Sequence, residues 1–462
     1  MFQHWTEKEV AASTLPDARL NPRLSRILTV LGRAPERSIP ASCSNWTDTL
    51  GVYRFLSNAR VGAEGILSGH RQATLERINQ ESLVFVAQDT TDISYSRLSA
   101  IGLGTLKKRA ITHCHLHVSV AFTPARVNLG VLKSTFWQRE GVLDEHDQRR
   151  PEHRALTERE SYRWLDHYLD ACAIAAKSPQ TRVVTLSDRE GDMHDIFEQA
   201  AQQPADARAE YIIRAKSDRD TLGQHLWQEM ASTPISGSFT LEVAKRGKQR
   251  ARQAHMELRF RQVTFPGSRN YRRVPVTVYV VQAKESHAPR GVEPIEWMLI
   301  TSVEVGSVEE ARTIVEWYSK RWEIEIFFRV IKQGCRIEAL RLQSSARIEK
   351  ALAVYLIIAW RIHVITMLGR AHPTSTADLV FGYMEWQTIY LMANKTPPPD
   401  QPPSLRDATR QLAQLGGFLA RKGDGEPGVQ SLWIGYQRIL EFILARQTIE
   451  QVAQQGGAKK CV

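Results

Sequence analysis

The chain has 462 residues, of which 42% are hydrophobic, so we expect two or three domains with cores of ordinary size. The net charge of +11 and the pI of about 9.5 favour a polyanionic partner such as nucleic acid, although a ribosomal or membrane surface would suit the same balance. Five scattered cysteines without a CxxC pair argue against a disulfide framework or a common zinc motif, and they indicate reduced thiols.

No signal peptide or membrane span is expected. The first ten residues carry acidic side chains and no apolar segment. The longest apolar run, at 351–360, is too short to cross a bilayer and is followed at once by Arg361. We therefore expect a buried helix there.

Residues 1–70 are predicted to form short helices. Within 17–28, Arg19, Arg23 and Arg26 are three or four residues apart, so they share one helical face. This face is either a solvated basic surface or a surface that contacts DNA, and the spacing alone does not distinguish the two.

The next part of the chain alternates between strands and helices, which indicates a mixed α/β sheet. Apolar runs predict strands at 83–88, 115–122, 126–132, 181–187 and 209–216, and helical periodicity predicts helices at 155–176 and 192–203.

From about 235 to 302 only strand-like runs occur, which predicts an all-β insertion between two parts of the α/β unit. Helical patterns resume later in the chain. They lie at 307–333, 345–368 and 431–455, with a Pro-rich linker at 394–404 and a Gly-rich loop at 421–428.

Two aspartates follow apolar strand-like runs. Asp89 follows 83–88, and Asp188 follows 181–187. Ligand sites gather at strand ends in open α/β sheets, so the repeated position favours a site over two turn-closing aspartates. Glu190 and Asp192 lie close by, and Asp192 suits a helix cap better than a ligand.

A third acid lies on a predicted helix over 318–332, where apolar residues occupy the other faces. Its polar residues are spaced three or four apart and form one stripe of Tyr318, Arg321, Glu325, Arg329 and Lys332. Simple ion pairing within the helix is one interpretation. The surplus of cations near a core favours phosphate oxygens as an external partner, and with three carboxylates a hard divalent cation is expected.

Three further groups of residues have side chains that could take part in a site. His113, His115 and His117 alternate on one strand face without a partner pair at zinc spacing, so we favour ordinary polar strand residues. Trp297 begins a strand and is either a core residue or a platform for a base taken out of a duplex. A basic run in the β insertion is either a solvated loop or a phosphate-contacting one, and it contains Lys245, Arg246, Lys248, Arg250 and Arg252.

With these motifs in order, the chain from about 17 to 440 resembles the DDE transposases of the insertion-sequence-four group. The resemblance rests on DTT at Asp89, DREGD at Asp188, and a Y-x2-R-x3-E-x6-K pattern that begins at Tyr318. It implies a ribonuclease-H-like core with a β insertion, an N-terminal DNA-end-binding domain at 1–70 and a C-terminal helical dimerisation region at 373–462. The core would comprise 71–235 and 303–372, with the insertion at 236–302.

The same resemblance implies roles for individual residues. Asp89, Asp188 and Glu325 would bind two Mg²⁺ ions, with Mn²⁺ as a substitute, and Trp297 would accept a flipped base. Arg329 stands where the family has lysine. The residues implied to contact phosphates near the cleaved end are Tyr318, Arg321, Arg329, Lys332, Arg214 and Lys216.

The implied reaction is cut-and-paste transposition. Water cleaves one strand, the freed 3′-hydroxyl forms a hairpin on the opposite strand, and the hairpin is opened before attack on target DNA. Terminal inverted repeats, target DNA and a second copy of the chain are the implied partners, in the bacterial cytoplasm at the nucleoid. The alternatives are a nuclease or resolvase that does not join DNA, and a non-catalytic DNA-binding regulator derived from a transposase.

Overall fold

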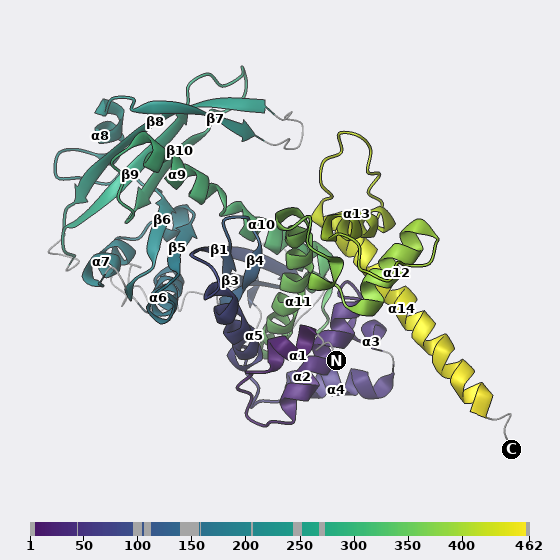
Figure 1. The fold of residues 1–462 in the computed structure, drawn as a ribbon. Coiled ribbons are helices and arrows are strands. Elements are labelled where there is room, and N and C mark those ends of the chain that lie inside the picture. Colours follow the sequence, from purple (N-terminus) through teal and green to yellow (C-terminus); the bar gives the residue numbers. More distant parts are fainter. Residues whose placement is uncertain are drawn as a thin grey trace.

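The computed structural model describes residues 5–43, 45–95, 104–105, 112–138, 157, 159–204, 207–243, 252–267 and 273–458. One long mixed sheet organises the molecule, and helices cover both of its faces (Figure 1). The strands are β1 (Leu83–Tyr95), β2 (Gly104–Thr105), β3 (Thr112–Phe122), β4 (Asn128–Trp137), β5 (Arg182–Ser187), β6 (Glu210–Arg214), β7 (Gly237–Val243), β8 (Arg252–Phe265), β9 (Val276–Glu285) and β10 (Glu296–Thr301).

The helices lie at both ends of the chain and between the strands. They are α1 (Trp5–Val10), α2 (Leu20–Arg33), α3 (Ile39–Ser42), α4 (Trp46–Ser57), α5 (Ala63–Ile78), α6 (Tyr162–Lys177), α7 (His194–Gln202), α8 (Leu226–Ser232), α9 (Val308–Ser319), α10 (Trp322–Arg329), α11 (Ser345–Ala371), α12 (Tyr383–Asn394), α13 (Leu405–Leu415) and α14 (Val429–Ala458).

The core of the sheet has the strand order β4-β3-β1-β5-β6. β1, β5 and β6 run parallel, whereas β3 is antiparallel to both β1 and β4. This is the expected mixed α/β arrangement of a ribonuclease-H-like core.

The strand-only segment after residue 235 is confirmed as β7 to β10, but these strands do not form a separate sheet. β10 pairs antiparallel with β6, where Leu299 lies opposite Arg214, and the order continues β10-β9-β8-β7. The free edge of β6 therefore continues into the insertion, because an unpaired strand edge offers backbone hydrogen bonds to the next strand.

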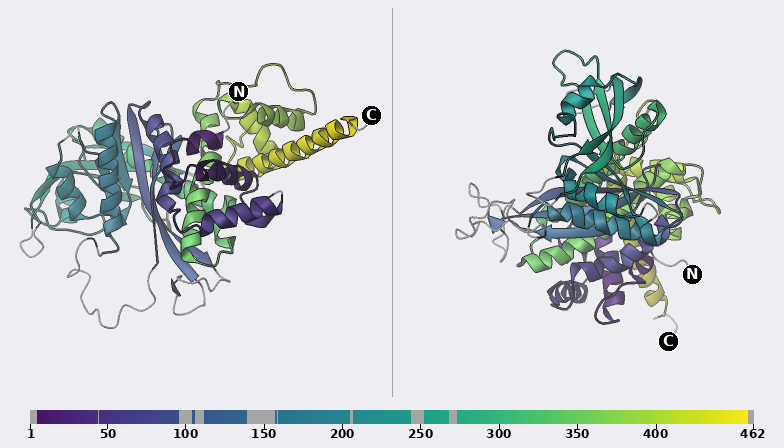
Figure 2. Two further views of the ribbon diagram at one scale, coloured as in Figure 1. Left: turned by 90° about the horizontal axis from the view of Figure 1, so that it is seen from below. Right: turned by 90° about the vertical axis from the view of Figure 1, so that its left-hand side faces the viewer.

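Side chains on β1 alternate between two cores on opposite faces of the sheet. Phe85 and Ala87 belong to the core covered by α5, α9, α10 and α11, whereas Val84 and Val86 belong to the core covered by α6, α7 and α8. Figures 1 and 2 agree that α6 and α11 lie on opposite sides of the sheet.

The apolar run at 351–360 is the centre of α11, a longer helix than expected. Among the described helices it alone has the length and composition to cross a membrane, yet almost all of it is buried inside the protein. The prediction of a buried helix is confirmed. A third core lies beyond α11, between α12, α13 and the first part of α14.

A buried polar cluster joins the N-terminal helices to the sheet. Glu9 on α1 is 2% exposed and accepts hydrogen bonds from Arg77 on α5, at 2.8 Å, and from His70. The other ring nitrogen of His70 accepts from the backbone N–H of Val131 on β4, at 2.9 Å. Next to it, Gly130 adopts a φ of +148° against fully buried Thr74.

We predict that Gly130→Ala destabilises the protein by about 2–4 kcal/mol, because this φ is strained for any L side chain and the new methyl meets a packed neighbour. A Cβ on Gly130 would lie 1.9 Å from Thr74 Oγ1. Urea unfolding measures the change. Gly223→Ala is the matched control, since a Cβ there meets open space. Equal stability of the two variants would contradict this packing.

Candidate active site

The parallel pairing of β1 with β5 brings the two aspartates together. The last paired residues are Ala87 and Leu186, and Asp89 and Asp188 each follow two residues later, near enough for Asp188 to raise the pKa of Asp89. By alternation both belong on the sheet face covered by α10. Asp188 follows the end of β5 as expected.

Asp89, in contrast, does not end its strand. β1 continues to Tyr95 because β3 remains paired with it, from Asp89 opposite Val118 to Tyr95 opposite Thr112. The expected strand end is therefore wrong for β1, and only its pairing with β5 stops near Asp89.

The predicted continuous helix over 318–332 is interrupted. α9 ends at Ser319 and α10 begins at Trp322, with tight three-residue turns between them. A π-helical turn then spans Val330–Gly334 and carries Lys332. The polar stripe is consequently divided among three elements, although Arg321 and Glu325 keep their four-residue spacing.

Arg321 links the third acid to the first. Its Nη1 lies 3.0 Å from Asp89 Oδ2 and its Nη2 lies 2.9 Å from Glu325 Oε1. Burial lowers the pKa of Arg321, but Tyr318, Asp89 and Glu325 outweigh that effect and raise it, so the guanidinium stays charged. The pair with Glu325 is the ion pairing within the helix that the sequence left open, whereas the pair with Asp89 was not foreseen.

The charge of the site is unbalanced around Asp89. The pKa of Asp89 is raised to about 7, chiefly by burial and also by nearby Asp188 and Glu325, while Arg321 opposes the rise. A divalent cation would relieve this repulsion, and carboxylate oxygens are the donors that hard cations prefer, so the residues present suit such an ion.

The three carboxylates are not gathered into a ready-made cage. Among the described residues, no three Asp, Glu, His or Cys side chains converge closely enough to hold a metal ion. The Arg321 guanidinium lies between Asp89 and Glu325 instead. For the three acids to share a cation, this side chain must move away.

Aromatic and basic side chains border the acids. Trp297 on β10 is half-buried and meets buried Tyr318 edge-on, with ring centroids 5.7 Å apart. Arg214 on β6 donates to the Glu296 carbonyl at 2.9 Å, and burial together with Arg189 lowers its pKa. The remaining expected phosphate contacts lie further out: Lys216 and Arg329 are exposed, and Lys332 is half-buried.

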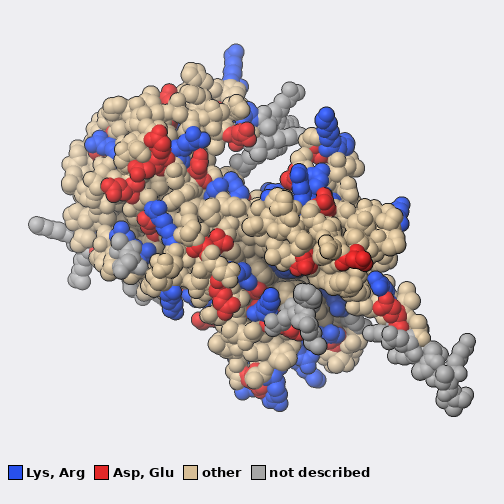
Figure 3. Space-filling view, viewed as in Figure 1, with Lys and Arg blue, Asp and Glu red and all other residues tan. Residues whose placement is uncertain are grey.

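The N-terminal arginines are on the surface, as a basic face requires, but two are ion-paired. Arg19 precedes α2 and pairs with Asp17 at 2.7 Å, while Arg26 pairs with Asp48 on α4 at 2.8 Å. Arg23 lines a hollow of about 450 Å³ between α2 and α4, together with Arg54. Basic and acidic side chains are interspersed over the face drawn in Figure 3.

Most of the basic run at 245–252 lies outside the described residues, namely Lys245, Arg246, Lys248 and Arg250. The remaining member, Arg252, begins β8 and forms a two-point ion pair with Glu285 on β9. Glu285 also accepts a hydrogen bond from the backbone of Ile295. This geometry favours a structural role for Arg252 over a phosphate contact.

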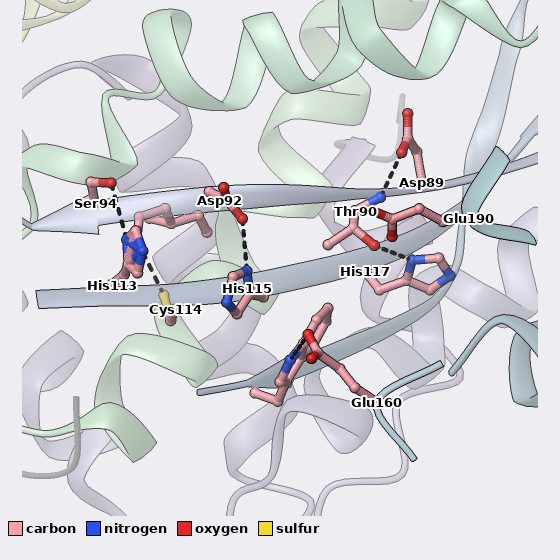
Figure 4. A network of polar contacts seen from close by, with 12 residues as sticks. Asp89, Thr90, Asp92, Ser94, His113, Cys114, His115, His117, Glu160 and Glu190 are labelled. Atoms are coloured by element: carbon pink, nitrogen blue, oxygen red, sulfur yellow. Dashed lines mark hydrogen bonds and ion pairs between the residues drawn. The ribbon is translucent and has the colours of Figure 1, made fainter. Parts of the chain in front are cut away.

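The histidines of β3 pair with β1 (Figure 4). His113 faces Ser94, His115 bonds Asp92 at 2.7 Å, and His117 bonds Thr90 Oγ1 at 2.9 Å. They are polar strand residues, as favoured from the sequence. Burial drives the pKa of His117 well below its usual value, so its ring is neutral.

The cysteines that the structure describes are free thiols, and Cys461 lies outside the described residues. The free thiols are Cys43, Cys114, Cys172 and Cys335.

Several residues near the site were not foreseen. Trp322 was expected to fill an apolar face but is 40% exposed. Glu323 is buried and pairs with Arg126 at 2.6 Å. Asp192 pairs with Arg219 and accepts from the Lys216 backbone, so it does not cap α7 as expected. Arg163 on α6 contacts Thr90 and Glu190. The partners of Glu323, Asp192 and Arg163 are remote in sequence, so no local sequence pattern could have identified these contacts.

Three family models match the chain in series. They are described as Transposase DNA-binding (residues 2–61), Transposase DDE domain (residues 197–361) and Transposase Tn5 dimerisation domain (residues 357–455). The DDE match includes Glu325 but begins after Asp89 and Asp188.

With this fold and these matches, the chain belongs to the DDE transposases, which cleave DNA and transfer strands with divalent metal ions. Within that class it resembles Tn5 transposase, and it binds DNA and forms dimers through the matched domains.

The raised pKa of Asp89 predicts a pH effect on the metal-free protein. A carboxyl group that titrates higher when folded stabilises the fold at low pH, and that contribution is lost as the pH rises through about 7. Asp89→Asn removes the titration. We therefore expect the variant to gain stability relative to the natural chain, on the order of 1–3 kcal/mol, between pH 5 and pH 8.

Urea unfolding in a chelator at several pH values measures this difference. Asp170→Asn is a control, since Asp170 pairs with Arg71 on α5, away from the acids. Parallel pH curves for the natural chain and Asp89→Asn would show that Asp89 titrates normally.

Proposed function

We propose that this transposase cuts and joins the ends of its own element at a site formed by Asp89, Asp188 and Glu325. The observation that carries the proposal is the β1–β5 register together with the Arg321 bridge. The register supports Asp188 as a neighbour of Asp89, and the bridge supports Glu325 as a second neighbour, although the three acids come from remote parts of the chain.

The three carboxylates would hold Mg²⁺, two ions per site, with Mn²⁺ able to replace it. Such ions supply charge neutralisation and activation of an attacking oxygen in phosphoryl transfer. The protein groups do the rest of the positioning. Arg321 is already charged and pointed at the acids, and its fork suits a phosphate once it leaves them.

Residues around the acids would hold the DNA end. The rings of Trp297 and Tyr318 are in contact, and Tyr318 lies near Arg214. Trp297 would stack on a base flipped from the duplex. Lys216, Arg329 and Lys332 would contact phosphates further along. The reaction would follow the cut-and-paste route, with hairpin formation and opening before strand transfer to target DNA.

The rest of the chain would bring two ends together. We assign 1–70 to recognition of the terminal inverted repeat, with Arg23 as its best-placed arginine, and 373–462 to the dimer contact. The core would comprise 71–235 and 303–372, with 236–302 as the insertion. We expect the protein to act in the bacterial cytoplasm, at the nucleoid.

Glu325→Gln is predicted to abolish cleavage of end DNA while binding of the same DNA at low salt persists, because the amide keeps the shape but loses the charge. Gel assays of cleavage and binding on one labelled duplex measure both.

Glu316→Gln is the matched control, since Glu316 on α9 is exposed and pairs only with Arg312 among the described residues. Equal loss of cleavage and binding in Glu325→Gln would mean that Glu325 supports the fold rather than the chemistry.

Affinity for end DNA is predicted to fall steeply with salt, because Lys and Arg that bind phosphates release condensed cations. Each contact contributes about −0.9 to the slope of log K against log salt. Fluorescence anisotropy from 50 to 300 mM salt would measure the slope, and Arg23→Met should make it shallower by about one contact. A flat response would rule out the assigned basic surfaces.

A further inference from the structure

One oxygen of each aspartate is held by a nearby backbone N–H. Asp89 Oδ1 accepts from Thr90 at 2.8 Å, and Asp188 Oδ1 accepts from Glu190 at 2.8 Å. These two bonds orient the carboxylates, so the positions of Thr90 and Glu190 decide where the aspartate oxygens point.

Among the described residues, no strand pairing joins Thr90 directly to Glu190. The hydrogen-bonded register between β1 and β5 ends at Ala87 and Leu186, before either aspartate. Thr90 remains paired with His117 on β3, and Glu190 lies in a short 3-10 turn after β5. A further contact is therefore needed to hold Thr90 and Glu190 at a fixed separation.

Arg163 supplies that connection from the opposite face of the sheet. Its Nε lies 3.3 Å from Thr90 Oγ1 and its Nη2 lies 3.2 Å from Glu190 Oε2. Figure 4 shows the Thr90 side chain directed away from the Asp89 carboxylate, toward His117. One guanidinium thus touches both residues whose backbones orient the aspartates.

The Arg163 side chain is itself fixed in place. It is 9% exposed, donates to the Glu160 carbonyl, and lies over the Trp137 ring with 4.2 Å to the centroid. Thr90 Oγ1 also bonds the neutral ring of His117 at 2.9 Å. Because stacking and several hydrogen bonds leave the planar guanidinium little freedom to rotate, it can hold its two partners, Thr90 and Glu190, at a fixed separation.

We propose that Arg163 is a positioning residue, which sets the spacing and orientation of the Asp89 and Asp188 carboxylates by bridging Thr90 and Glu190. In this role it acts through its contacts with Thr90 and Glu190. The proposal rests on the proposed function, since it assumes that these two aspartates bind the divalent cation.

The test is direct Mn²⁺ binding to the full chain, by titration calorimetry, together with the Mn²⁺ concentration for half-maximal cleavage of end DNA. Arg163→Met keeps the apolar stem over Trp137 and removes the fork. Groups that orient metal ligands typically change affinity by 10–100-fold. We expect Mn²⁺ affinity to fall by about 10-fold or more, with end-DNA affinity in chelator nearly unchanged.

Two further variants separate positioning from folding. Thr90→Val removes the hydroxyl but keeps the N–H that orients Asp89, and Thr90→Ser restores the hydroxyl. We expect Thr90→Val to resemble Arg163→Met, Thr90→Ser to retain Mn²⁺ affinity, and the Arg163→Met/Thr90→Val double variant to lose little more than either single one.

Arg182→Met is the matched control. Arg182 also lies over a tryptophan, Trp317, at 5.0 Å and pairs with Glu210, but at the other end of β5. Its Mn²⁺ affinity should be unchanged.

Unchanged Mn²⁺ affinity in Arg163→Met, or fully additive losses in the double variant, would overturn the positioning role. If the natural chain cuts DNA and Asp188→Asn does not, that result leaves the proposed function standing. A natural chain that neither binds Mn²⁺ nor cuts would overturn both.

Discussion

The ion pairs of Arg321 with Asp89 and Glu325 are the interaction on which the site depends. Two carboxylates that enter from β1 and α10 would repel each other in a half-buried site, and one guanidinium holds both within hydrogen-bonding distance. The single guanidinium does not fully offset the burial of Asp89 and the negative charges of Asp188 and Glu325 beside it. This accounts for the raised pKa of Asp89, since burial and the neighbouring acids outweigh the arginine.

The same interaction suggests how one residue can serve two states of the site. Arg321 occupies the space between acids that a cation would need, and its fork suits phosphate oxygens equally well. When metal and DNA bind, Arg321 would exchange its carboxylate partners for phosphate oxygens, and the cation would replace Arg321 beside the acids. No further unpaired charge would then be buried. The interrupted helix at Ser319–Trp322 gives Arg321 a position at the start of α10, outside a regular helical stripe.

Local sequence patterns predicted much of this molecule. Apolar runs located β5, β6 and the strands of the insertion, and the two motifs around Asp89 and Asp188 located the paired strands. The extent of β1 was not predictable, because pairing with β3 extends the strand past its apolar half. The joining of β10 to β6 depends on a strand edge that no local pattern describes.

Side chains whose partners are remote in sequence were the main omission. Arg163, Glu323 and the Glu9–His70 pair each lie in ordinary helical segments, and only the folded sheet gives them their partners. Arg321 pairs with Glu325 as one interpretation of the helix allowed, but its second partner, Asp89, lies 232 residues away and was not foreseen. Spacing along one helix predicts its neighbours on that helix and not the strand that packs against it.

The central claim is that Asp89, Asp188 and Glu325 bind divalent cations together. A crystal structure of the full chain with end DNA and Mn²⁺, with the ions located by anomalous scattering, tests it most directly. The account predicts Mn²⁺ within about 2.0–2.6 Å of oxygens from all three carboxylates, with Arg321 turned toward a phosphate. Mn²⁺ bound elsewhere, or Arg321 still lying between Asp89 and Glu325, would contradict it.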